Sequence, residues 1–249
     1  MNKRIFLWAL LAVVLFVFGY AGFRYYEIQQ VYAIGDNLYD EMRDLWLYDA
    51  DDDAQSDMDA ELGIPPKGID WEALQDFNED IIGWLYSPGT VIDYPVMRAD
   101  DYNFWLNRLP DRTFNANGSL FLDYNHNPDF SSPISVIYGH HMRSGAMFGT
   151  LENYRRQAFF DGHPVMFLYT PNRNHRIDLM YGFVVAEGQW RARAFMFEPN
   201  LPSLLEFAAT NTTFESDVSF EEGDRMVGLS TCSYDFDGAR YVVLGILRP

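Results

Sequence analysis

The chain carries one cysteine, Cys232, in a stretch whose pattern predicts two strands joined by a turn. The apolar run at residues 226–231 precedes the cysteine. A polar turn with Gly238 follows it, and then Arg240 heads a β-branched run at residues 241–247. Such a hairpin places a thiol and a guanidinium where both can face one pocket. Nearby positive charge favours the thiolate, which is the nucleophilic form of cysteine.

A lone cysteine is commonly a buried structural residue, because free cysteine is among the most buried residue types. Two features favour a chemical role for Cys232. It follows Ser230 and Thr231 at a predicted strand end rather than lying within an apolar alternation. The chain also has the features of an exported protein, where an unpaired thiol is a liability unless it is used.

The second chemical element is the sequence I-Y-G-H-H-M at residues 137–142, which begins on an apolar strand and ends in a turn. His140 or His141 is the candidate acid–base partner of Cys232. The remaining histidines occupy polar contexts typical of the surface; they are His126, His163 and His175.

Metal chemistry is not predicted for the two adjacent histidines, since no third ligand of metal-site spacing lies nearby. The order histidine before cysteine argues against a papain-like protease, where the cysteine comes first. Thiol, imidazole and guanidinium together indicate acyl transfer and leave the substrate open.

The elements that must position these groups are short strands. Residues 82–86, 91–96, 119–123, 135–138, 165–169, 176–186, 226–231 and 241–247 give about eight of them, separated by Pro- and Gly-containing turns. Helical insertions are expected at residues 151–160 and 201–209, and Asp70 is expected to cap a short helix at residues 71–77. The pattern predicts a mainly β protein, a barrel or a sandwich.

The N-terminal region predicts a membrane anchor. Residues 5–23 are uncharged and almost wholly apolar, and nineteen residues of helix span close to 30 Å, about the thickness of a bilayer core. A cleaved signal peptide usually has a shorter apolar core, and no clean small-x-small cleavage site follows. Lys3 and Arg4 favour a cytoplasmic N-terminus. We therefore expect a single-pass protein of the cell membrane with its catalytic domain extracellular.

The chain divides by pattern into an anchor at residues 1–24, a helical and acidic linker region at 25–69, and one domain at 70–249. The acidic run at residues 49–61 is expected to be a solvated linker or exposed loop. A net charge of −18 argues against a nucleic-acid partner, which requires basic surface. An apolar fraction of 48% rules out global disorder.

Several stretches follow one another in the order of a known family: NEDIIGWL at residues 78–85, PGTVIDYPV at 88–96, GSLFLDY at 118–124, YGHHM at 138–142 with MF at 147–148, and the whole run at 229–247. Together they resemble the class B sortases, membrane-anchored cysteine transpeptidases of Gram-positive bacteria. The resemblance implies an eight-stranded sortase-type β-barrel with N-terminal helices, preceded by a transmembrane helix. It also implies an inserted helix before the cysteine strand, which residues 201–209 fit.

The resemblance also implies site roles. His140, directly after Tyr-Gly, matches the catalytic histidine, Cys232 the nucleophile, and Arg240 the arginine that begins the next strand. Ser230 and Thr231 are expected to line the substrate pocket, and no metal or cofactor is implied. His141 is expected to be non-catalytic. Gly228 replaces a usual threonine, with little expected effect on chemistry.

The implied partners are surface proteins that carry a C-terminal sorting signal, often of the N-P-x-T-x type. Cys232 would cleave the signal through a thioacyl-enzyme. The new carboxyl end would pass to an amine of the peptidoglycan precursor lipid II or of a pilin lysine. Three alternatives remain open: a secreted cysteine protease that releases its product to water, a non-catalytic barrel that binds wall proteins, and a purely structural scaffold.

Overall fold

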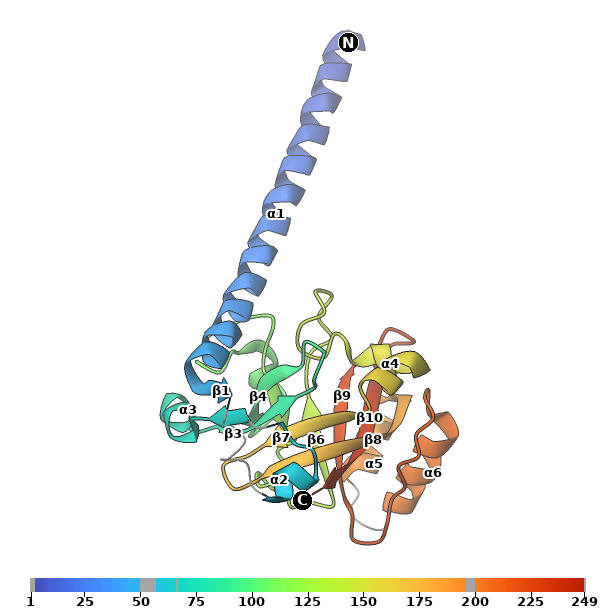
Figure 1. Ribbon diagram of the computed structural model, residues 1–249. Coiled ribbons are helices and arrows are strands. Elements are labelled where there is room, and N and C mark those ends of the chain that lie inside the picture. Colours follow the sequence, from blue (N-terminus) through green and yellow to red (C-terminus); the bar gives the residue numbers. More distant parts are fainter. Residues whose placement is uncertain (1–2, 50–56, 66, 196–199, 249) are drawn as a thin grey trace.

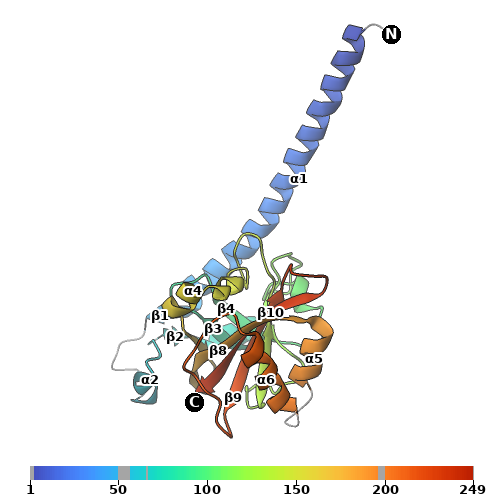
Figure 2. The same cartoon turned by 90° about the vertical axis from the view of Figure 1, so that its right-hand side faces the viewer.

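A computed structural model describes residues 3–49, 57–65, 67–195 and 200–248. Its most extended element is α1 (Lys3–Trp46), one uninterrupted helix of 44 residues that rises away from the remaining chain (Figures 1 and 2). At 1.5 Å per residue this helix is about 66 Å long. An 18-residue stretch of this helix near the N-terminus has a mean hydropathy of 1.9, and none of it is buried. By length and composition α1 can therefore cross a membrane.

The other end of α1 packs on the barrel. Tyr39 and Met42 are buried there, and the Tyr39 hydroxyl donates to the carbonyl oxygen of Gly118 at 2.5 Å. Arg43 donates from Nη1 to the carbonyl oxygen of Asp93 at 2.8 Å. The predicted boundary between residues 24 and 25 falls inside this continuous helix, which crosses it without a break.

Short elements connect α1 to the barrel. β1 (Leu47–Asp49) pairs with β2 (Lys67–Ile69), and α2 (Asp57–Glu61) lies between them in the chain. Of the acidic run predicted to be a loop, residues 50–56 lie outside the described residues. The helix predicted at residues 71–77 is confirmed as α3 (Trp71–Phe77), where Asp70 Oδ1 accepts from the backbone N–H of Ala73 at 3.0 Å.

Eight strands close into a barrel in the order β10-β8-β7-β3-β4-β5-β6-β9, which confirms the predicted fold. All neighbours are antiparallel except β4–β5 and β6–β9, which are parallel. The barrel interior is filled by aliphatic and aromatic side chains in one continuous core. The strands are β3 (Ile81–Tyr86), β4 (Asp93–Arg98), β5 (Leu120–Leu122), β6 (Ile134–Tyr138), β7 (Val165–Tyr169), β8 (Asn174–Ala186), β9 (Arg225–Cys232) and β10 (Ala239–Arg248).

Two of the predictions were wrong in detail. The helix expected at residues 151–160 is two pieces, the 3-10 helix η3 (Leu151–Arg155) and α4 (Gln157–Gly162), because Arg156 between them has extended backbone angles. His175, expected on the surface, is 2% exposed, since it faces inward from β8 with Nδ1 3.1 Å from the carbonyl oxygen of Arg248.

The segment between β8 and β9 contains two helices where the sequence predicted one. The predicted helix is α6 (Leu201–Asn211), and the additional helix is α5 (Glu187–Phe195), which starts directly after β8. A further short 3-10 turn, η2 (Trp105–Asn107), lies between β4 and β5. Both α5 and η2 border the cleft that contains Cys232.

Candidate active site

Cys232 and Arg240 face each other across the last hairpin of the barrel. Cys232 ends β9, Arg240 is the second residue of β10, and their Cα atoms are register partners in the antiparallel pair. Side chains directly opposite in such a pair project to the same face. Gly238, with φ of 72°, allows the connecting turn its left-handed backbone. The thiol and the guanidinium therefore share one face by register, as the sequence predicted.

His140 reaches the same place by a different route. β6 runs parallel to β9 with Tyr138 opposite Ser230, so the chain leaving β6 passes the end of β9. Thr231 Oγ1 donates to the carbonyl oxygen of Gly139 at 2.8 Å, which fixes this exit. A Cβ atom on Gly139 would come within 2.4 Å of Leu120 and 2.7 Å of Phe148. Only glycine fits immediately before His140.

The two adjacent histidines have different partners. His140 Nε2 lies 2.6 Å from the carbonyl oxygen of Leu106 in η2. Because a carbonyl only accepts, Nε2 carries a proton in this contact and leaves Nδ1 for other chemistry. His141 Nδ1 lies 3.0 Å from the carbonyl oxygen of Cys232. His140 is thus held by the backbone of η2, whereas His141 holds the backbone of the cysteine itself.

An ionic network lies behind the thiol and holds the β9–β10 turn. Arg155 of η3 donates to Ser233 at 3.0 Å and pairs with Glu152 at 3.0 Å and with Asp235 at 2.5 Å. Hydrogen bonds from Arg155 and Ser233 lower the pKa of Asp235 to about 2. The Glu152 carboxylate also lies 4.0 Å from His141 Nδ1. These contacts connect η3 to the side chains of Ser233 and Asp235, which follow Cys232, and to His141.

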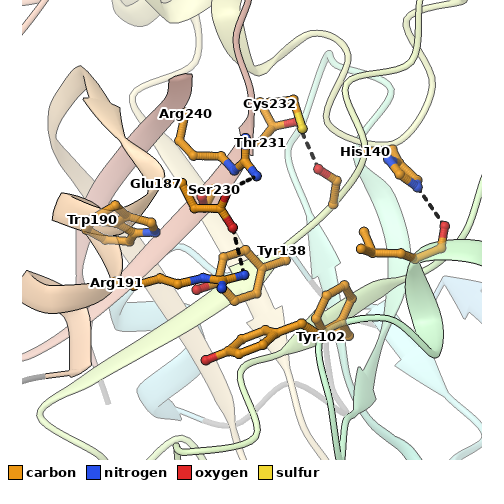
Figure 3. Close-up of a pocket in the computed structure, with 13 residues that line it drawn as sticks. Tyr102, Tyr138, His140, Glu187, Trp190, Arg191, Ser230, Thr231, Cys232 and Arg240 are labelled. Atoms are coloured by element: carbon orange, nitrogen blue, oxygen red, sulfur yellow. Dashed lines mark hydrogen bonds and ion pairs between the residues drawn. The ribbon is translucent and has the colours of Figure 1, made fainter. Parts of the chain in front are cut away.

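The groups surround a cleft of about 530 Å³, a volume that includes the space opening to solvent. Cys232 lies between Arg240 and His140 in Figure 3, and the predicted Ser230 and Thr231 also line the cleft. Ser230 Oγ is buried and has no hydrogen-bond partner among the described residues. The full lining is Tyr102, Leu106, Phe121, Tyr138, Gly139, His140, Glu187, Trp190, Arg191, Ser230, Thr231, Cys232 and Arg240.

Two tyrosines line the cleft, Tyr138 at the end of β6 and Tyr102 in the segment between β4 and η2. Burial raises the pKa of Tyr138, and the Asp123 carboxylate raises it further. The same two causes raise the pKa of Tyr102. Both phenols therefore stay neutral at physiological pH and offer hydrogen-bond donors rather than charge. In the described part of the chain, no group of three His, Cys, Asp or Glu side chains is arranged to hold a metal ion.

Sequence reasoning missed the wall that α5 contributes. Glu187 and Arg191 of this helix line the cleft and pair with each other at 2.8 Å. Their spacing of four residues, acid before base, is a recognised helix-stabilising pattern and was the signal available in the sequence. Gly188 in the first turn obscured it, since glycine is unfavourable within helices.

No protein-family model matches the sequence. Among curated proteins the chain is similar to sortase B of Listeria monocytogenes, with 29% identity over 182 residues that cover 70% of this chain and 72% of the relative. Sortase B of Staphylococcus aureus is 26% identical over 177 residues, with the same two coverages. The crystal structure of the Staphylococcus aureus enzyme superposes with a TM-score of 0.66 at 26% identity and covers 71% of this chain and 85% of that one. The sequence similarity and the shared barrel fold together support a class B sortase.

Proposed function

We propose that this sortase is a membrane-anchored cysteine transpeptidase that uses Cys232, His140 and Arg240 as its catalytic residues. The observation that carries the proposal is the convergence of the three groups at one end of the barrel. Register pairing brings Cys232 and Arg240 together, and the parallel β6–β9 pair brings His140 beside them. The three differ in acid–base character as an acyl transfer requires.

In the proposed mechanism the Cys232 thiolate attacks the carbonyl carbon of a threonine in a C-terminal sorting signal. Arg240 stabilises the resulting oxyanion with charge-assisted hydrogen bonds. His140 protonates the departing amine. With Nε2–H on the Leu106 carbonyl, the proton available in this geometry is the one on Nδ1 of the imidazolium. The fragment of the sorting signal that follows the threonine leaves with its new amino terminus, and a thioacyl-enzyme remains.

An amine then attacks the thioester, with His140 acting as base, and the thiolate of Cys232 is expelled. The related enzyme of Staphylococcus aureus has been crystallised as a substrate complex and, separately, sortase B has been crystallised with triglycine. These complexes support a peptide donor and an amine acceptor here. We propose surface proteins with N-P-x-T-x-like signals as donors and lipid II, or a pilin lysine, as acceptor. Ser230 and Thr231 line the cleft beside the thiol and would contact the donor.

The anchor is part of this proposal. Residues 1–24 are proposed to lie in the bilayer, residues 25–69 to connect, and residues 70–249 to form the extracellular catalytic barrel. The loop after β6 and the turn between β9 and β10 lie on the side of the barrel from which α1 rises (Figures 1 and 2). The cleft end of the barrel would therefore face the membrane, where a lipid-linked acceptor is found.

The test uses the full chain in detergent with quenched peptides of the N-P-x-T-x and L-P-x-T-G types, with and without triglycine. Products and trapped thioacyl-enzyme are followed by mass spectrometry. We expect cleavage, amine-dependent ligation and an adduct on Cys232, all lost in Cys232→Ala. Cleavage without ligation to any amine would favour the protease alternative. Ligation by Cys232→Ala would remove this cysteine from the mechanism.

A further inference from the structure

Glu187, the first residue of α5, bridges the two arginines of the cleft. Its Oε2 accepts from Arg240 Nη2 at 2.9 Å, and its Oε1 pairs with Arg191 Nη2 at 2.8 Å. Figure 3 shows the three side chains in a row along one side of the cleft. All three are partly buried, with Arg240 21% exposed, Glu187 35% and Arg191 39%. The carboxylate is therefore shared between two guanidinium groups at the mouth of the site.

The contacts of Arg240 restrict its guanidinium to one orientation. Nη1 donates to the carbonyl oxygen of Ala239 at 3.1 Å, and Nη2 donates to Glu187. A guanidinium has five N–H donors in a rigid plane, so two anchored donors fix that plane and leave three for a substrate. Without Glu187, only the contact to the neighbouring carbonyl would hold the group among the described residues.

Glu187 is itself fixed in position by neighbours on three sides. Its backbone N–H donates to the carbonyl oxygen of Gly238 in the β9–β10 turn at 3.0 Å. Arg191, which shares its carboxylate, stacks with its guanidinium carbon 4.2 Å from the centre of the Tyr102 ring. Cation–π contacts of this kind add to the ion pair. A continuous chain of contacts thus runs from Tyr102 to Arg240.

Trp190 fixes the rest of α5 on the barrel. This indole is fully buried and packs edge-on against Phe183 of β8 at 6.1 Å. Its ring also lies where a side chain at position 228 would be, because a Cβ atom on Gly228 would come within 3.1 Å of it. Gly228 stands where the resemblance to class B sortases leads us to expect a threonine. Its missing side chain provides the space that seats α5 and hence Glu187.

We propose that Glu187 is a positioning residue for Arg240, an inference that rests on the proposed function. Its carboxylate holds the guanidinium so that the free N–H donors point at the developing oxyanion, while Arg191 holds the carboxylate. The role is supplied by α5, the first of the two helices between β8 and β9, not by the barrel. Glu187 does not touch the substrate, and its effect on turnover passes through Arg240.

The first measurement is turnover of the full chain in detergent with the peptide and triglycine assay. Glu187→Gln keeps the size and loses the charge. We expect kcat to fall about 10- to 100-fold, as misplacement of a catalytic group does, with KM changed less than about threefold. Glu187→Asp should recover part of the loss. The matched control is Glu206→Gln on the exposed face of α6, which makes the same change of charge on the neighbouring helix and should leave kcat unchanged.

A double-mutant cycle separates positioning from general structural damage. Because Glu187 acts through Arg240, Glu187→Gln should cost little further activity in an Arg240→Lys background. Equal losses in both backgrounds, or an equal loss with Glu206→Gln, would overturn the proposal. A change confined to KM would overturn it as well, since that result assigns Glu187 to substrate binding.

A measurement independent of activity tests the contacts of Glu187 with Arg240 and Arg191, which we call the clamp. In the full chain labelled with ¹⁵N-arginine, a fixed guanidinium gives separate Nη signals, which a freely rotating one averages. We expect the Arg240 signals, identified by their loss in Arg240→Lys, to be separate in the wild type and Glu206→Gln and averaged in Glu187→Gln. Signals unchanged in Glu187→Gln would contradict the clamp. A wild type with separate signals but no turnover would contradict the proposed function and, with it, a catalytic role for the clamp.

Discussion

The cleft has two walls of different construction. The strand wall carries Cys232, Arg240 and His140 and is placed by backbone pairing, in which each residue has a fixed partner on the next strand. The helical wall carries Glu187 and Arg191 and is placed by side-chain packing, chiefly of one buried indole. Backbone register tolerates many side-chain changes, whereas a packed helix depends on the size of individual residues. The strand wall should therefore determine whether the reaction occurs, and the helical wall how efficiently.

The largest effect should come from the strand wall, where two neighbouring histidines allow a direct contrast. His140→Ala should lower kcat/KM about 10³-fold, because general acid–base groups contribute on that order. His141→Ala should cost less than about tenfold, since this residue contacts the Cys232 carbonyl rather than the reacting atoms. Steady-state kinetics and thermal unfolding of both variants check the contrast. A loss in His141→Ala as large as that in His140→Ala would refute the assignment of His140 as the sole acid.

Arg240→Lys comes next in size. Lysine keeps the charge and loses the planar fork, so we expect kcat to fall about 100-fold, as when one oxyanion donor is removed. Single-turnover acylation of Cys232 measures this effect directly. An unchanged acylation rate would show that charge alone is sufficient and would weaken the argument from guanidinium orientation.

The helical wall should respond to size at position 228. Gly228→Thr, the residue usual in the family, forces a side chain into the Trp190 ring and should cost about 1–3 kcal/mol through overpacking. We expect faster hydrogen exchange in α5 and a lower kcat/KM. Gly188→Ala is the control, because a Cβ atom there meets nothing within 4 Å. Adding Trp190→Leu to Gly228→Thr should relieve the clash, and full stability of Gly228→Thr alone would be evidence against the packing argument.

The smallest effect is a loss of stability at low pH, which we expect in the strands of the barrel around His175 rather than in α5. Burial lowers the pKa of His175 to about 4, below its ordinary value of about 6.5. Above pH 6.5 the residue is neutral in both folded and unfolded chains and contributes nothing. As pH falls from 6.5 towards 4 the unfolded chain binds the proton first, so the barrel loses stability, by about 2 kcal/mol at pH 5.

Chemical unfolding of the full chain in detergent at pH 7 and pH 5 measures this loss. His175→Gln is the control, since its amide can still donate to the Arg248 carbonyl and does not titrate. Hydrogen exchange, corrected for intrinsic rates, should show the loss in β8 and β10. An equal pH response in His175→Gln would assign the effect to other groups.

The barrel and the strand wall were predictable because their signals are local. Alternating apolar runs gave the strands, and the turn with Gly238 gave the hairpin that joins Cys232 to Arg240. The order of residues also gave His140 as a candidate, although adjacency alone could not separate it from His141. Their different partners, Leu106 and the backbone of Cys232, come from segments distant in sequence.

The helical wall was not predictable, because the contacts that place it are not local in the sequence. Gly188 weakens the helical signal of α5, and the force that seats the helix is a contact between Trp190 and a strand 38 residues further along the chain. His175 was predicted to lie on the surface because its neighbours in the sequence are polar, although it occupies an inward-facing position of β8. Contacts of this range follow from tertiary packing rather than from local pattern.

The continuity of α1 would fix the distance between the cleft and the membrane surface. With residues 1–24 in the bilayer, as proposed, about 10 Å of helix separates Arg24 from Val31, and from Val31 to Arg43 the helix is hydrogen-bonded to the barrel domain. On this proposal the rigid helix would confine the cleft to a thin layer above the membrane, where donor and acceptor would meet by lateral diffusion at high effective concentration. A surface protein would be processed only if the spacer between its own membrane segment and its sorting signal reaches that layer. The position of the barrel along α1 would thus select substrates by the length of their spacer.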